Sequence, residues 1–219
     1  TVTGSITLPG TTKNQFTYEL KENTKADNYN VKTVEGDLTV TDVSEANKYT
    51  ATVKAVSGNS KYDGNEHTVS GVEGTAFEWK GHNYTIEGLE ATVAGKNAGS
   101  YINKVIGQAV VKDEAGHDVT KQFKVVSEDG KLTVSKRILT LTSADDRKVY
   151  DGSALGNENV FLEGDDFVKG EKPAYVFGEN TKPVEAGTYS NDFTCQFAND
   201  VKEDNYDITI KAGTLIIEQ

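Results

Sequence analysis

The chain has 219 residues, of which 36% are hydrophobic and 26% charged, with 21 glycines, one cysteine and no methionine. Its formal net charge of −11 argues against nucleic-acid binding, which needs lysines and arginines gathered on one face, and a single cysteine excludes a disulfide framework or a cysteine-based zinc site. No apolar run approaches the ~20 residues that cross a bilayer and no signal peptide opens the sequence, so we expect no membrane span and, without methionine, a piece of a longer protein.

Apolar and polar residues alternate with a period of two along much of the chain. From the N-terminus, this alternation begins at Phe16, Tyr18 and Leu20. It recurs in three later runs, at residues 49–55, 132–134 and 193–197. Such a period is typical of half-buried strands, and the Asp-Gly pairs between the runs are typical of tight turns. No window favours an amphipathic helix, so the fold is predicted to be all-β.

The C-terminal part of the chain repeats the N-terminal part. Residues 10–40 align without a gap onto residues 187–217, and both segments carry an Asp-Asn-Tyr triplet, at 27–29 and 204–206. A central segment is a looser copy of both. Because each repeat of such an array forms one structural unit, we predict tandem small Ig-like β-sandwiches.

A second motif, Tyr-Asp-Gly, marks the front of the repeat. It occurs at residues 62–64 and 150–152 and is missing from residues 1–42. We interpret it as a turn in which the aspartate caps backbone amides and the tyrosine packs at the edge of a sandwich. The predicted domains are a truncated repeat that is only a C-terminal half (1–42), a β-sandwich repeat with an insertion (43–136) and a further β-sandwich repeat (137–219).

The boundary between the last two predicted repeats has no flexible linker. Residues 132–141 contain neither glycine nor proline, so the last strand of one repeat is predicted to run almost directly into the first strand of the next. A junction of one or two residues allows little hinge motion. We therefore expect the repeats to form an elongated arrangement.

Four short motifs follow one another in the last predicted repeat. They are Tyr-Asp-Gly at 150–152, Ala-Gly-Thr-Tyr at 186–189, Asn-Tyr-Asp-Ile at 205–208 and Gly-Thr-Leu-Ile-Ile at 213–217. Their order resembles the MBG-type repeats (mostly β, glycine-rich) of bacterial cell-surface, adhesin-like proteins. The middle repeat departs from this pattern, with Gln-Phe at 122–123 in place of Asn-Tyr. The resemblance implies tandem Ig-like sandwiches in an extracellular stalk, and it implies no catalytic residues.

The middle predicted repeat contains an aromatic segment with the only tryptophan of the chain. Trp79 and Tyr84 lie close together there, and exposed aromatic side chains on a sandwich are typical of sugar or protein recognition. The alternative is that Trp79 fills the core of this larger repeat. We keep Trp79 and Tyr84 as candidate ligand-binding residues, with a host glycan or a host protein as the partner.

Three further features have structural interpretations that we favour. Acidic clusters such as residues 163–166 lack the spaced loop pattern of calcium sites, so no metal site is predicted and weak calcium binding is the only cofactor left open. Residues 18–22 resemble the box with which collagen-adhesin B-type domains form a Lys–Asn crosslink, but the aligned residues 195–199 lack its glutamate. Cys195 aligns with Tyr18 and is expected to be a buried structural residue.

The sequence contains no motif that points to catalysis. A catalytic triad, a nucleophile elbow, a phosphate loop and a dinucleotide fingerprint are all missing, so we do not expect an enzyme. The leading hypothesis is a non-enzymatic stalk or spacer on the bacterial cell surface, which displays a distal functional domain and has neighbouring repeats of the same chain as partners. The second hypothesis is a carbohydrate- or protein-binding module centred on Trp79 and Tyr84.

Overall fold

The protein is an all-β structure. The computed structural model describes all 219 residues, and 51% of them lie in strands. Helical backbone is limited to short 3-10 turns, namely η1 (Ala26–Asn28), η2 (Glu45–Asn47), η3 (Thr120–Gln122), η4 (Glu179–Thr181) and η5 (Glu203–Asn205). None of these is long and apolar enough to cross a membrane. The all-β prediction is therefore confirmed.

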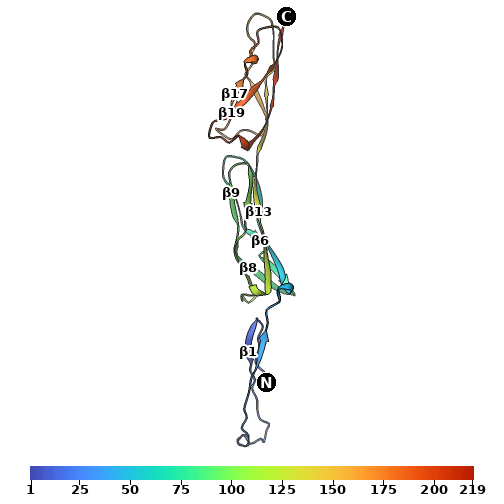
Figure 1. Cartoon of the computed structure of the whole chain (residues 1–219), viewed down its shortest axis with the longest axis vertical. Helices are drawn as coiled ribbons and strands as arrows, with labels where there is room; N and C mark the ends of the chain where they lie inside the picture. The colour runs from blue at the N-terminus through green and yellow to red at the C-terminus, as the bar shows by residue number, and fades with distance from the viewer. The chain divides into compact units, whose positions relative to one another are not determined.

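Contacts divide the chain, whose ribbon is drawn in Figure 1, into two compact units. Unit 1 consists of Thr1–Lys54, Val72–Glu90 and Ile106–Glu128, and unit 2 consists of Ala55–Gly71, Ala91–Val105 and Asp129–Gln219. The boundaries predicted after residues 42 and 136 divide the sequence by its repeats rather than by contacts, and they stay a prediction.

Unit 1 contains one two-stranded and two three-stranded sheets. Its strands are β1 (Gly10–Asn14), β2 (Gly36–Val40), β3 (Tyr49–Ala55, ending one residue into unit 2), β6 (Val72–Glu73), β7 (Ala76–Trp79), β8 (His82–Glu90), β11 (Ile106–Lys112) and β12 (Phe123–Glu128). The sheet orders are β1-β2, β11-β8-β7 and β12-β3-β6.

The core of unit 1 is built from alternate residues of the three-stranded sheets. Ala51 and Val53 of β3 are buried together with Ile86 of β8, Val111 of β11 and Phe123 of β12. Since the two β3 residues lie two positions apart on one face of the strand, the strand predicted from alternation at residues 49–55 is confirmed.

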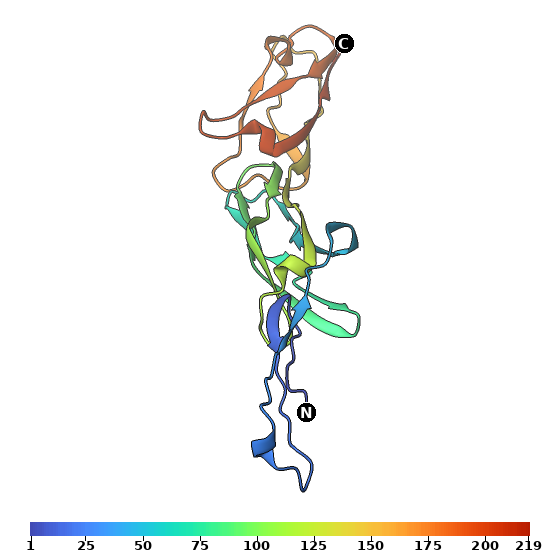
Figure 2. The ribbon, with the colours of Figure 1, turned by 60° about the horizontal axis from the view of Figure 1, so that its bottom comes forward.

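Residues 1–42 contribute only the antiparallel pair β1–β2. A long loop joins the two strands (blue in Figure 2), and it contains no strand. The strand predicted from Phe16, Tyr18 and Leu20 is therefore wrong, because only Phe16 makes an isolated bridge and all three side chains are exposed. The aligned Phe193 lies in a strand that pairs with β17 (Ala174–Phe177), whereas residues 15–17 make only a few backbone hydrogen bonds to residues 1–4.

Unit 2 contains three three-stranded and two two-stranded sheets. Its strands are β4 (Gly58–Lys61), β5 (His67–Ser70), β9 (Thr92–Gly95), β10 (Gly99–Asn103), β13 (Gly130–Ser135), β14 (Arg137–Ser143), β15 (Asp146–Val149), β16 (Val160–Gly164), β17 (Ala174–Phe177), β18 (Gly187–Asn191), β19 (Phe193–Gln196), β20 (Tyr206–Lys211) and β21 (Gly213–Glu218). The sheet orders are β10-β13-β4, β16-β14-β20, β15-β21-β18, β17-β19 and β5-β9.

The same pairing pattern occurs more than once among these sheets. β14 lies between β16 and β20 and runs parallel to β20, just as β3 lies between β6 and β12 and runs parallel to β12. Likewise, β13 lies between an antiparallel neighbour, β10, and a parallel neighbour, β4. β21 lies in the same way between antiparallel β18 and parallel β15. The register agrees too, because Arg137 lies opposite Tyr206 and Tyr49 lies opposite Phe123.

The largest core of unit 2 extends to both sides of Lys136. This single residue separates β13 from β14, as predicted for the junction. Leu132 and Val134 of β13 lie in one cluster with Leu139 and Leu141 of β14. The other buried members of the cluster are Tyr62, Phe167, Phe193 and Tyr206.

Candidate functional site

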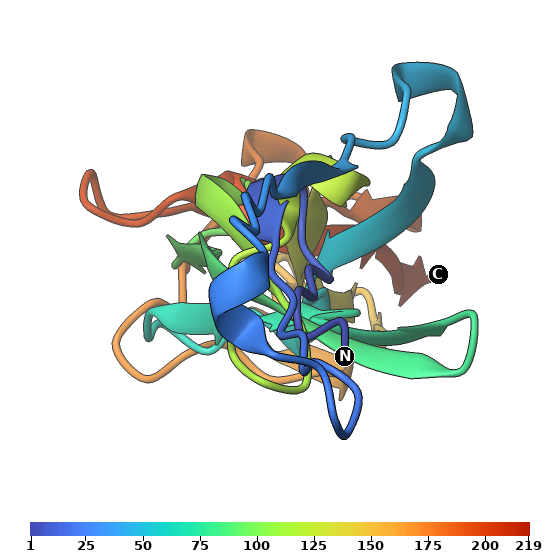
Figure 3. The same ribbon diagram turned by 90° about the horizontal axis from the view of Figure 1, so that it is seen from below.

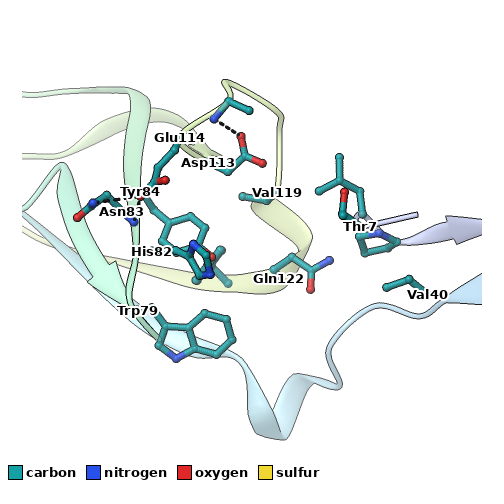
Figure 4. Close-up of a pocket in the computed structure, with 14 residues that line it drawn as sticks. Thr7, Val40, Trp79, His82, Asn83, Tyr84, Asp113, Glu114, Val119 and Gln122 are labelled. Atoms are coloured by element: carbon teal, nitrogen blue, oxygen red, sulfur yellow. Dashed lines mark hydrogen bonds between the residues drawn. The ribbon is translucent and has the colours of Figure 1, made fainter. Parts of the chain in front are cut away.

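A pocket of about 510 Å3 in unit 1 contains both candidate ligand-binding residues. Trp79 and Tyr84 line it, and each is half-buried. Figure 4 shows their rings on one side of the pocket and Val40 on another, with Glu114 at the rim. The volume lies in the range of small-ligand pockets, ~300–1,000 Å3.

A tight hairpin of β7 and β8 (teal to green in Figure 3) carries the two aromatic residues. Lys80 and Gly81 form its turn with φ values of 52° and 81°, and two successive positive φ angles are the mark of the turn that matches strand twist. The register sets Trp79 opposite His82 and Phe77 opposite Tyr84. Trp79, Phe77 and Tyr84 therefore lie on one face of the hairpin.

Phe123, at the start of β12, forms the floor of the pocket. Its ring centroid lies 4.7 Å from that of Tyr84 and 5.5 Å from that of Trp79, and Phe123 itself is buried. The Lys80 ammonium group lies 4.5 Å from the centroid of the Trp79 ring, a distance at which a cation is attracted to the ring face. Trp79 thus contacts the core of unit 1 through one part of its ring and leaves another part to the pocket.

Carboxylates lie at the rim. Glu114 accepts hydrogen bonds at Oε1 from the backbone N–H of Asn83 (2.8 Å) and from its side-chain amide (3.1 Å). These bonds hold the pKa of Glu114 below its usual range. The backbone N–H of His117 does the same for the pKa of Asp113, at 2.8 Å. The rim therefore carries negative charge above an apolar floor, and it offers oxygen acceptors to a ligand.

The third wall of the pocket comes from residues 1–42. Leu8 packs against the core of unit 1, and Pro9 and Val40 line the pocket beside it. The side-chain amide of Gln122 lies 3.5 Å from the carboxylate of Asp42, which is a weak contact. Residues 1–42 are thus held against β12 and its neighbours mainly by Leu8, Pro9 and Val40.

Unit 2 contains a second notable arrangement, around the first Tyr-Asp-Gly motif. We call it the joint, and it consists of β4 with residues 62–64 and 97–98 on one side of Lys136, and Arg137, residues 165–171 and residues 205–206 on the other. Tyr62 is 2% exposed. Its hydroxyl donates to Glu171 at 2.7 Å, and the hydroxyl of Tyr206 donates to the other carboxylate oxygen at 2.6 Å. One carboxylate therefore links tyrosines from the two sides.

Ion pairs and backbone hydrogen bonds add to the joint. Lys61 donates to both carboxylate oxygens of Asp165, at 2.7 and 3.0 Å, and this bond lowers the pKa of Asp165. The Arg137 guanidinium donates from Nε to the carbonyl of Tyr62 at 2.8 Å. The backbone N–H of Ala98 donates to the side-chain oxygen of Asn205 at 2.8 Å. Side-chain and backbone contacts thus bind both sides together.

The second Tyr-Asp-Gly motif has no such surroundings. Tyr150 is 49% exposed, although its backbone N–H donates to Glu218 of β21 as that of Tyr62 donates to Ser135 of β13. In both motifs the aspartate accepts a backbone N–H two residues later, at 2.9 Å, so the predicted capping turn is confirmed. The predicted packing of the tyrosine at the edge of a sandwich holds for Tyr62, which is buried among residues from beyond Lys136. It is wrong for Tyr150, which is about half exposed.

The other features singled out from the sequence lie outside the pocket and the joint. Cys195, predicted to be a buried structural residue, is half-buried and packs against the core of unit 2. Burial raises the pKa of its thiol. No three His, Cys, Asp or Glu side chains lie close enough together to hold a metal ion. Weak calcium binding stays a prediction.

Glu171 and Phe123 were not singled out from the sequence. Glu171 is one of 34 acidic residues and no motif marks it. Phe123 could have been found, because it aligns with Tyr206 in the repeat. Comparison of the chain with protein-family models, with curated proteins and with solved structures finds no match.

Proposed function

We propose that this chain is a non-enzymatic stalk or spacer segment of a bacterial cell-surface, adhesin-like protein. It consists of tandem Ig-like sandwich repeats in an elongated arrangement, lies outside the cell, and displays a distal functional domain. The shared pairing pattern of β14 with β20 and β3 with β12 supports the repeats. The proposal needs no reactive group, since its mechanism is extension and stiffness.

The joint in unit 2 is the observation that carries this proposal. A spacer transmits position only if successive repeats do not swing about their connection. Lys136 is a connection of one residue, and a single core cluster includes side chains from both sides of it. The hydrogen bonds of Tyr62 and Tyr206 to Glu171 support the proposal further, because they also join the two sides. Net charge of −11 keeps neighbouring stalks soluble and apart.

Spin labels on the two sides of the joint test its stiffness. Ser100 and Thr188 are exposed on β10 and β18, and they can be replaced by labelled cysteines once Cys195 is changed to serine. We expect one narrow distribution of distances between the labels, which Tyr62→Ala broadens and Tyr150→Ala leaves narrow. A broad distribution in the otherwise unchanged protein contradicts the spacer function.

The aromatic pocket favours a second candidate function, recognition of a host glycan or a host protein by Trp79 and Tyr84. Trp79 is the only tryptophan, so its fluorescence reports directly on binding to a panel of glycans. Loss of that binding in Trp79→Ala, with an unchanged melting temperature, supports a recognition module. A large fall in melting temperature instead assigns Trp79 to the core.

A further inference from the structure

The edge of β2 beside the pocket has no partner strand. β2 has one neighbour, β1, whereas β13 and β21, which align with β2 in the sequence repeat, each have two. The second neighbour runs parallel in both cases, as β4 beside β13 and β15 beside β21. An unpaired edge of this kind is a template for the addition of a strand.

The side chains of β2 are incompletely covered in the same way. Leu38 and Val40 are half-buried, whereas the aligned Leu132 and Val134 are 1% and 2% exposed. The two pairs occupy equivalent positions on their strands, and each strand has an antiparallel neighbour, β1 beside β2 and β10 beside β13. Two differences accompany this exposure: β2 lacks the parallel neighbour, and Leu38 lies opposite Thr12 where Leu132 lies opposite Tyr101.

In the joint, the parallel neighbour of β13 is β4, and a tyrosine follows it directly in the chain. β4 ends at Lys61, and the next residue, Tyr62, packs edge-on against Tyr206 with ring centroids 5.8 Å apart. Phe123 occupies the place of Tyr206, because each begins the strand that runs parallel to the first strand of its sheet. Phe123 and Val40 border the pocket in unit 1, so the pocket lies where the equivalent of Tyr62 would lie.

The pocket also offers the polar partner that a buried tyrosine needs. Tyr62 donates its hydroxyl to the Glu171 carboxylate. At the pocket rim, Glu114 uses Oε1 for both of its bonds to Asn83 and leaves Oε2 as an acceptor. The pocket and the joint differ at one backbone position, where Pro9 aligns with Ala98. Proline has no N–H, so Pro9 cannot make the bond that Ala98 donates to Asn205. This side of the pocket is therefore less closed than the joint.

We propose that the pocket of Trp79 and Tyr84 binds a β-strand that ends in Tyr-Asp-Gly, supplied by another copy of this repeat. The strand adds parallel to β2 and its tyrosine enters the pocket. From the register of β4 on β13, the residue before the tyrosine lies opposite Thr41. This inference rests on the proposed function, because it treats residues 1–42 and 43–136 as successive repeats.

A synthetic peptide with the sequence of residues 56–66 tests the proposal on the full chain. It contains tyrosine but no tryptophan, so Trp79 fluorescence reports only on the protein. We expect saturable binding with a Kd of ~10–1,000 µM, since a free peptide loses its conformational entropy on binding, and slower hydrogen exchange at residues 38–41. The same peptide with Tyr62→Ala is expected to bind more than about tenfold more weakly.

Two variants of the protein separate the edge of β2 from general effects of charge. Val40→Asp places a carboxylate on the pocket wall and is expected to abolish binding. Thr39→Asp is the matched control, because Thr39 lies on the opposite face of β2 and is exposed, and it is expected to retain binding. Equal binding of the alanine peptide, or binding that survives Val40→Asp, overturns the proposal.

A fused peptide covers the case in which a free peptide binds too weakly to detect. Joining residues 56–66 ahead of Thr1 through a flexible linker raises the effective concentration to the millimolar range. We expect the melting temperature followed by Trp79 to rise, and the Tyr62→Ala form of the fused segment not to raise it. No rise in either form, or quenching of Trp79 by a glycan but not by the peptide, overturns the proposal. The spin-label measurement on unit 2 is independent of this pocket, so a failed strand addition and a flexible joint are distinguishable results.

Discussion

At the scale of single residues, Tyr62 and Tyr150 form a natural comparison. Both belong to a Tyr-Asp-Gly turn, and both donate a backbone N–H to a neighbouring strand, Tyr62 to Ser135 of β13 and Tyr150 to Glu218 of β21. Tyr62 is 2% and Tyr150 is 49% exposed. The difference comes from Glu171, Phe167 and Tyr206, which cover Tyr62 from beyond Lys136.

Truncating the two tyrosines is expected to have unequal effects. Tyr62→Ala removes a buried ring and leaves a cavity, so the free energy of unfolding should fall by about 3–5 kcal/mol. Tyr150→Ala is the matched control and should change it by less than about 1 kcal/mol. Urea denaturation followed by circular dichroism measures both. Equal losses would mean that the tyrosine acts within its own turn rather than in the joint.

The stability of the joint is expected to depend on pH in the alkaline range. Burial, with the nearby Glu171 carboxylate, raises the pKa of Tyr62 to about 12 from an ordinary value of 10, and burial also raises the pKa of Tyr206. The neutral phenols are thus favoured by folding, so their contribution is fully present below pH 10 and is lost as the pH rises from 10 towards 12.

Melting temperatures measured across this range check the prediction. The double variant Tyr62→Phe, Tyr206→Phe has no phenol at the joint, and it should therefore show a smaller fall in melting temperature between pH 10 and 12 than the unchanged protein. A fall of the same size in both proteins would assign the alkaline transition to other groups.

At the scale of secondary-structure elements, one asparagine fixes the end of a strand in unit 2. Asn191, the last residue of β18, is fully buried. Its side-chain amide donates to the carbonyls of Ala144 at 2.9 Å and Asn157 at 2.8 Å. It thereby connects β18 to the turn that follows β14 and to the loop before β16. The aligned Asn14 ends β1, where no equivalent turn lies beside it.

Replacing this asparagine tests its role in the sheet. Asn191→Ala removes the donor from the buried carbonyl of Ala144 and from the partly buried carbonyl of Asn157, and an unsatisfied buried group costs about 1–3 kcal/mol. Asn14→Ala breaks no such pair and should cost much less. Thermal unfolding of the two variants checks this difference, and a larger effect at Asn14 would contradict it.

Strand formation itself follows from pairing as much as from the pattern of residues. The segments that begin at Phe16 and Phe193 align without a gap, yet only the second becomes a strand, β19, which pairs with β17. Residues 1–4 lie beside the segment at Phe16, but only the bridge between Val2 and Phe16 and a few backbone hydrogen bonds join the two. Because a strand needs a continuous run of paired backbone groups, alternation with this short pairing did not produce a strand at Phe16.

At the scale of the whole molecule, the proposed spacer function predicts an extended particle in solution. A compact domain of 219 residues has a radius of gyration of ~17 Å. Small-angle X-ray scattering at moderate salt, which screens repulsion between highly charged molecules, should give a clearly larger value. A radius near that of a compact domain would contradict the elongated arrangement and the spacer function with it.

The sequence by itself determined the all-β class, the strand at residues 49–55, the capping turns of both Tyr-Asp-Gly motifs and the one-residue connection at Lys136. These features depend on neighbours along the chain, and period-two alternation and Asp-Gly turns record such neighbours directly. Trp79 and Tyr84 could also be named, because their composition is unusual within a short segment.

Only the tertiary structure decided which of these residues are covered. The same three-residue motif is buried at Tyr62 and open at Tyr150, and aligned residues of β2 and β13 differ in burial, because coverage comes from segments far away in sequence. Glu171 could not be found among the other acidic residues for the same reason: its role is set by two tyrosine hydroxyls that reach it from opposite sides of the joint.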